Sequence, residues 1–136
     1  MAESDFVVVA APLTPDTYHL IDAAALRQMK PGAVLINISR GDVVDEPALI
    51  EALRDRRIAG AALDVFSLEP LPADSPLWRM GDPDHQPAHG RVVLTPHIAG
   101  ITPNYKRRAA ALFADNLRRY IGGQPLLNRV DFVRGY

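Results

Sequence analysis

Three polar side chains have the types and positions needed for proton transfer on a small organic acid. Arg40 directly follows an apolar run, and its planar guanidinium can hold a carboxylate through two hydrogen bonds. His97 follows another apolar run, and its imidazole can give or accept a proton near neutral pH. Glu69 lies in a loop, where a carboxylate beside an imidazole would orient the ring and favour its protonated form. Together they predict a site that binds a carboxylate and moves a proton.

Each of these residues also has an ordinary structural explanation. Arg40 could be a surface residue that pairs with Asp42 or Asp45, both of which are close in sequence. A single histidine is often only a hydrogen-bonding residue, and Glu69 is an unremarkable loop acid unless His97 lies nearby. From position alone, the functional and the structural explanations both remain open.

The elements that would position these residues alternate between strands and helices. Apolar runs without polar alternation, typical of strands covered on both faces of a parallel sheet, occur at residues 6–11, 33–38, 60–65 and 92–95. Helical patterns follow at residues 22–29, 46–56 and 103–121, and residues 67–91 read mostly as loop. This order predicts an α/β fold, a parallel sheet of about four strands with flanking helices.

Polar residues follow the carboxyl end of every predicted strand. They are residues 12–17, 39–41, 64 and 96–97. The carboxyl ends of parallel strands meet at one edge of a sheet, where α/β proteins bind their ligands. Asp64, which closes the third run, could accept a hydrogen bond from a ligand amide or only cap the turn that follows. The spacing therefore predicts one site at this edge.

Composition excludes several classes of function. The 136 residues are 48% hydrophobic and 23% charged, which is ordinary for one folded domain. The net charge of −1 gives no electrostatic basis for binding nucleic acid or an anionic membrane. Apolar runs fall far short of the roughly 20 residues that span a bilayer. The sequence has no cysteine, so thiolate ligands and nucleophiles are excluded; we expect a cytoplasmic protein without a metal site.

Five motifs in a fixed order carry a family resemblance. They are MKPGA at residues 29–33, NISRGDVVDE at 37–46, GAALDVF at 60–66, EP at 69–70 and LTPHIAG at 94–100. With these motifs the sequence resembles the D-isomer-specific 2-hydroxyacid dehydrogenases over nearly its whole length. The resemblance implies hydride transfer between NAD, with NADP as the alternative cofactor, and a small 2-keto or 2-hydroxy acid.

The resemblance also implies a role for each matching residue. Arg40 would anchor the substrate, His97 would be its acid and base, and Glu69 would partner His97. Asp64 would accept a hydrogen bond from the nicotinamide carboxamide. The other cofactor contacts implied, beside Arg40 and His97 themselves, are Ala11, Pro12, Thr17, Ile38, Ser39, Ala99 and Gly100.

One feature of the family is missing from the sequence. No G-x-G-x-x-G turn, the motif that binds the cofactor's pyrophosphate, occurs among the 136 residues. We therefore expect residues 1–136 to be the second half of a Rossmann-type doubly wound domain with a C-terminal helix and tail. The Gly-rich half and the substrate domain would be absent, so the chain would be a fragment of low activity or would be completed by another polypeptide.

Further departures and alternatives concern the substrate and the state of the protein. Residues 77–91 form a longer loop than the family suggests, and residues 101–105 differ from its usual pattern, so the particular keto acid is undetermined.

A catalytically silent remnant that binds a partner is the main alternative function, and a transcriptional co-regulator is a weaker one. Residues 6–11 would be an unpaired edge strand, which predicts self-association, most simply as a homodimer.

Overall fold

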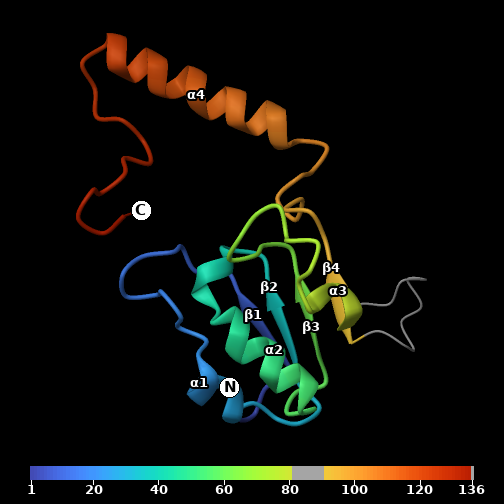
Figure 1. Ribbon diagram of the computed structural model, residues 1–136. Helices are drawn as coiled ribbons and strands as arrows, with labels where there is room; N and C mark the ends of the chain where they lie inside the picture. Colours follow the sequence, from blue (N-terminus) through green and yellow to red (C-terminus); the bar gives the residue numbers. More distant parts are fainter. Residues whose placement is uncertain (81–90, 136) are drawn as a thin grey trace. The chain divides into compact units, whose positions relative to one another are not determined.

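The computed structural model describes residues 1–80 and 91–135 (Figure 1). Most of the long loop expected at residues 77–91 therefore lies outside the described residues. Contacts within the chain divide it into two compact units, Met1–Ala99 and Gly100–Tyr136. The candidate catalytic residues all belong to the first unit.

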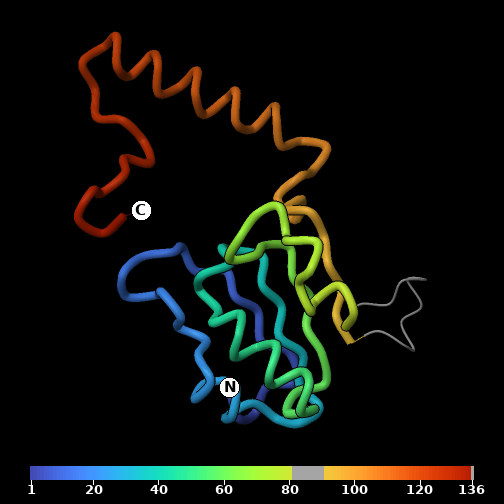
Figure 2. The backbone as a smooth tube through the Cα atoms, in the orientation of Figure 1, coloured from blue at the N-terminus to red at the C-terminus, as the bar shows by residue number. Residues whose placement is uncertain are grey.

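A four-stranded parallel sheet forms the centre of the first unit (Figure 2). Its strands lie in the order β1 (Phe6–Val9), β2 (Val34–Asn37), β3 (Gly60–Leu63) and β4 (Val92–Leu94), and each neighbouring pair is parallel. The predicted α/β fold is thus confirmed, with each strand shorter than its apolar run. In the described part of the chain β1 is an edge strand, as the sequence predicted.

Two of the predicted helices connect these strands. Helix α1 (Ala23–Arg27) begins after Asp22, whose carboxylate accepts a hydrogen bond of 2.8 Å from the backbone N–H of Ala25. Helix α2 (Glu46–Arg54) begins after Asp45, which caps the N–H of Ala48 at 3.1 Å. A 3-10 turn (Gly41–Val43) precedes α2, and a short helix α3 (Leu77–Met80) occurs where the sequence predicted only loop. One turn of helix is too short to leave a periodic apolar pattern.

The core lies between α1, α2 and one face of the sheet. It contains Leu35 of β2 and Leu63 of β3, packed with Leu26 of α1 and with Leu49 and Leu53 of α2. These side chains share a face because alternate residues of a strand point the same way.

The opposite face of the sheet is largely uncovered. Phe6, Val8 and Val93 expose 66%, 55% and 62% of their area. The prediction that the strands are covered on both faces is wrong for these positions, because α1 and α2 both pack on the other side. The sequence has the apolar content of a two-sided sheet, whereas the described chain covers one side.

The second unit consists of helix α4 (Tyr105–Ile121) and an irregular tail. The helix ends at Ile121, as predicted, with Gly122 as its C-cap, and Asn116 Oδ1 holds the tail by accepting a 2.7 Å hydrogen bond from the N–H of Leu127. The apolar side chains of Leu112 and Leu117 on this helix are exposed, so its apolar face is not buried within this unit. Among residues 1–80 and 91–135, no helix combines the length and the apolarity that crossing a membrane requires.

Candidate active site

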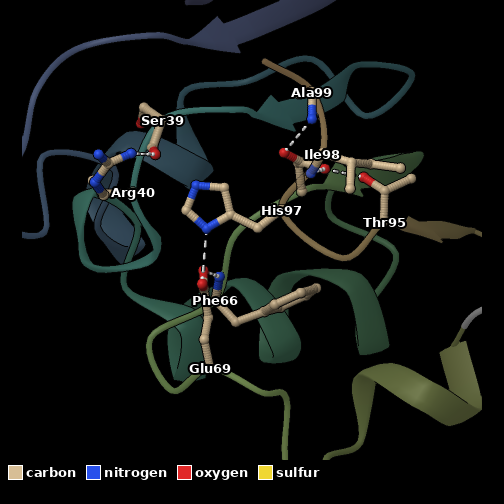
Figure 3. A network of polar contacts seen from close by, with 9 residues as sticks. Ser39, Arg40, Phe66, Glu69, Thr95, His97, Ile98 and Ala99 are labelled. Carbon is tan, nitrogen blue, oxygen red and sulfur yellow. Dashed lines mark hydrogen bonds and ion pairs between the residues drawn. The ribbon is translucent and has the colours of Figure 1, made fainter. Parts of the chain in front are cut away.

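His97 and Glu69 form a hydrogen-bonded pair at the carboxyl edge of the sheet (Figure 3). His97 Nδ1 lies 2.8 Å from Glu69 Oε2, and Glu69 Oε1 accepts a 3.1 Å hydrogen bond from the N–H of Phe66. The hydrogen bond with His97 is the main cause of a lowered pKa of Glu69; burial opposes it, and the Phe66 N–H and the charges of His97 and Arg40 add to it. The side chains of His97 and Glu69 are 47% and 37% exposed. The pair is therefore fixed in orientation and open to a ligand.

Arg40 lies next to this pair on the side of the imidazole that carries Nε2 (Figure 3). Its guanidinium donates a 2.7 Å hydrogen bond to the backbone oxygen of Ser39. In the described residues neither Asp42 nor Asp45 pairs with it, and Asp45 instead lies 4.0 Å from His19. The surface ion pair considered from the sequence is thus not formed.

Asn37 holds the backbone that carries Arg40. This residue ends β2 and is only 1% exposed. Its Oδ1 accepts hydrogen bonds from Ser39 N–H at 3.1 Å and from Ser39 Oγ at 2.9 Å, while its Nδ2 donates to the backbone oxygen of Arg40 at 2.9 Å. Asn37 had no predicted role from the sequence. The available signal was an amide at the end of an otherwise apolar strand.

Asp64 holds the turn that carries His97. Its Oδ1 accepts from Thr95 Oγ1 at 2.5 Å and from the N–H of Ile98 at 2.9 Å, and its Oδ2 accepts from the N–H of Ala99 at 2.8 Å. The His97 N–H donates to the backbone oxygen of Asp64 at 2.8 Å. His97 has φ 55°, in the left-handed region that non-glycine residues seldom adopt. These contacts hold a strained histidine in place.

The same contacts determine the ionisation of Asp64. Asp64 is only 4% exposed, and burial raises the pKa of its carboxyl group; the three hydrogen bonds and the charge of His97 together outweigh burial and lower this pKa below the usual 3.8. Asp64 is therefore a carboxylate at neutral pH. A carboxylate offers about four acceptor positions, so Oδ2 retains one for a ligand.

The other residues expected to contact a cofactor follow β1 and β2 at the same edge. Thr17 closes its loop by donating from Oγ1 to the backbone oxygen of Pro12 at 2.7 Å. Ala11 is half-buried, and Ile38 is exposed. Gly100 directly follows Ala99 and is the first residue of the second unit.

A cavity of about 420 Å³ adjoins the His97–Glu69 pair. Its walls are mainly apolar and come from three segments of the first unit: Phe66 and Leu71 near Glu69, Trp78 of α3 and Leu94 of β4. In the described residues, no group of three or more histidine or acidic side chains is arranged to hold a metal ion.

Acid should destabilise the first unit through Asp64 and Glu69. Both folded pKa values lie below the ordinary values of 3.8 and 4.5, so both groups stabilise the fold above those values and lose this contribution as pH falls through the folded pKa. We expect the urea concentration at the midpoint of unfolding to decrease as the pH is lowered below about 5. In the Asp64→Asn variant, stability should depend less steeply on pH in this acid range. The change in slope should be smaller for Glu69→Gln, because solvent screens the exposed carboxylate of Glu69. If acid lowers the stability of Asp64→Asn as steeply as that of the parent protein, this assignment is contradicted.

Comparison with known proteins identifies the family. Residues 1–99 match the profile of the D-isomer specific 2-hydroxyacid dehydrogenase, NAD binding domain. Glyoxylate/hydroxypyruvate reductase B of Pectobacterium carotovorum is 47% identical over 131 residues, which are 96% of this chain and 38% of that protein. The (S)-sulfolactate dehydrogenase of Chromohalobacter salexigens is 46% identical over 90% of this chain and 37% of its own length.

Solved structures agree with the sequence comparison. A D-isomer specific 2-hydroxyacid dehydrogenase from Xanthobacter autotrophicus, in complex with NADPH and MES, superposes with a TM-score of 0.86 at 49% identity, covering 99% of this chain and 51% of that one. The NADPH-dependent glyoxylate/hydroxypyruvate reductase of Sinorhizobium meliloti, with NADP and sulfate, has a TM-score of 0.84 at 33% identity, covering 99% of this chain and 41% of its own. The chain thus spans about two fifths of the curated relatives' length, with the fold of part of a Rossmann-type domain. It belongs to the D-isomer specific 2-hydroxyacid dehydrogenase family.

Proposed function

We propose that this chain supplies the catalytic half of an NAD(P)-dependent oxidoreductase that interconverts a small 2-keto acid and its D-2-hydroxy acid. The observation that carries the proposal is the His97–Glu69 pair, whose free Nε2 faces the side on which Arg40 lies (Figure 3). A carboxylate held by Arg40 would place the adjacent carbonyl within reach of that nitrogen. The relatives named for glyoxylate, hydroxypyruvate and sulfolactate support this class of substrate.

In this proposal His97 supplies the proton, and Glu69 fixes the orientation of the imidazole ring. Glu69 accepts a hydrogen bond at Nδ1, so a protonated ring presents its second N–H at Nε2. As a hydride reaches the carbonyl carbon, the proton moves from Nε2 to the carbonyl oxygen and leaves a neutral ring. Arg40 holds the substrate carboxylate during the reaction and so keeps the carbonyl oriented toward the imidazole of His97.

The residues at the sheet edge fit a nicotinamide cofactor, which would supply the hydride. Asp64 Oδ2 has one acceptor position left for a carboxamide N–H, and the proposed wall of the cofactor site consists of residues that follow the four strands. The residues assigned to it are Ala11, Pro12, Thr17, Ile38, Ser39, Arg40, Asp64, His97, Ala99 and Gly100. NADPH and NADP in two related structures make either form of the cofactor part of the proposal.

The proposed domain organisation places residues 1–136 in the second half of the dinucleotide-binding domain, with the C-terminal helix and tail. The exposed edge strand β1 and its uncovered side chains Phe6 and Val8 support completion by further protein, either a second copy or a chain that carries the Gly-rich half. A cytoplasmic location, which the cysteine-free composition favours, belongs to the same proposal.

A chimera tests the proposed activity. The matching region of the Pectobacterium reductase would be replaced by this chain, and NADPH oxidation would be followed with glyoxylate and hydroxypyruvate. We expect turnover that His97→Ala lowers by about 10²–10⁴-fold, and Arg40→Ala should chiefly raise KM because the carboxylate anchor is lost. Arg54→Ala, which changes an exposed arginine at the C-terminal end of α2, is the matched control.

The competing function is an assembly module without catalysis. The uncovered apolar face that includes Phe6, Val8 and Val93 favours it. A chimera that folds and binds NADPH but turns over neither substrate, while the isolated chain associates with itself in sedimentation equilibrium, would overturn the enzymatic proposal and support this one.

A further inference from the structure

The segment after Arg40 and the loop that carries Glu69 are in direct backbone contact. A Cβ added to Gly41 would lie 2.0 Å from the carbonyl carbon of Phe66 and 2.3 Å from the nitrogen of Ser67. A second contact lies beside this one, because Glu46 Oε2 accepts a 3.2 Å hydrogen bond from the Ser67 N–H. Two points of attachment thus join segments that are about 25 residues apart.

The two adjacent amides of this loop are bound by two different carboxylates. The Phe66 N–H is bonded to Glu69, which in turn holds His97. The Ser67 N–H is bonded to Glu46, in the first turn of α2. Because α2 is anchored in the core by Leu49, which is 1% exposed, Glu46 is a rigid attachment for an otherwise exposed loop.

We propose that Glu46 is a positioning residue for the His97–Glu69 pair, acting through the Ser67 N–H. The inference rests on the proposed function, since it assigns Glu46 to the service of that acid–base pair. Without the Glu46 contact, the loop would be held beside Gly41 by packing alone. Glu69 would then sample positions from which its carboxylate does not reach His97.

A purely local role for Glu46 makes a different prediction. An acid in the first turn of a helix stabilises the helix through its dipole, and removing it would cost stability without moving Glu69. Loss of its negative charge would also lower the pKa of Glu69 slightly, because one like charge nearby has gone. Loosening of the loop acts in the opposite direction, because it weakens the contacts with His97, the Phe66 N–H and Arg40 that lower this pKa.

Two substitutions separate these effects. Glu46→Ala removes both the charge and the acceptor, whereas Glu46→Gln removes the charge and keeps an amide oxygen that can accept from Ser67. Both lose the same dipole interaction. Glu46→Met, which keeps the length of the side chain without an acceptor, replaces Glu46→Ala if that variant fails to fold. Glu51→Ala changes an exposed acid on the same helix and serves as the control.

The experiment is a carbon-13 NMR titration of the Glu69 carboxyl group in the isolated chain, combined with amide hydrogen exchange at Ser67. We expect Glu46→Ala to raise the Glu69 pKa toward its ordinary value and to accelerate Ser67 exchange by about two- to tenfold. Glu46→Gln should do neither. Equal behaviour of the two variants, or an unchanged Glu69 titration in folded Glu46→Ala and Glu46→Met, would overturn the proposal. No cofactor or substrate is needed, so this outcome is independent of whether the chimera is active.

Discussion

We expect Gly41→Ala to lower the free energy of unfolding by about 3 kcal/mol, the upper part of the range for overpacking a tightly packed site. The added methyl would overlap the backbone of Phe66, with 2.0 Å to both its carbonyl carbon and its oxygen. Backbone cannot rotate aside as a flexible side chain can, so the loop must move away from the 3-10 turn. Urea unfolding measures the loss. Because Phe66 and Ser67 lead directly to Glu69, the hydrogen bond to His97 should be lost as well.

Gly32→Ala is the control for this substitution. Gly32 has open space around the position of a Cβ and no left-handed φ. Alanine there should leave the free energy of unfolding unchanged or raise it by about 0.4–1 kcal/mol, because alanine lowers the conformational entropy of the unfolded chain. Equal unfolding free energies of the two variants would show that the close approach at Gly41 relaxes without cost.

The fold was predictable because its signals are local. Each strand lies within an apolar run, and the starts of α1 and α2 carry a capping aspartate, Asp22 or Asp45, directly before the apolar pattern. The alternation of strands and helices allows few topologies, since crossovers between parallel strands are right-handed. Because the carboxyl ends of parallel strands meet at one edge of a sheet, the sequence also predicted that Arg40 and His97 lie at the same edge.

The supports that Asp64 and Glu46 give to the site were not predictable, because they join residues far apart in sequence. Asp64 meets Ile98 and Ala99 across 34 and 35 residues, and Glu46 meets Ser67 across 21. Nothing in the local sequence indicates which amide a carboxylate will find. The burial of both faces predicted from the apolar pattern failed at β1 for a similar reason, since an apolar strand looks the same whether or not a described element packs on it.

Asp64 matters for the structure as well as for the proposed cofactor contact. The resemblance implied one role, a hydrogen bond to a carboxamide, whereas the structure shows three of its acceptor positions used by the chain itself. A residue that both ends a core strand and restrains a turn is expected to be intolerant of change even without any ligand. The proposed cofactor role adds to that constraint.

Replacing Asp64 by alanine should cost about 3 kcal/mol in the free energy of unfolding, because three hydrogen bonds to a charged acceptor are lost together. His97, at φ 55°, should then relax and separate from Glu69, which would appear as accelerated exchange of the Ile98 and Ala99 amides. Asp64→Asn keeps one acceptor oxygen, so about half the loss is expected. Asp16→Ala, at an exposed loop acid, should change neither quantity. If the Asp64→Ala chain is as stable as the parent and its amides at 98 and 99 stay protected, the turn that carries His97 keeps its conformation without Asp64.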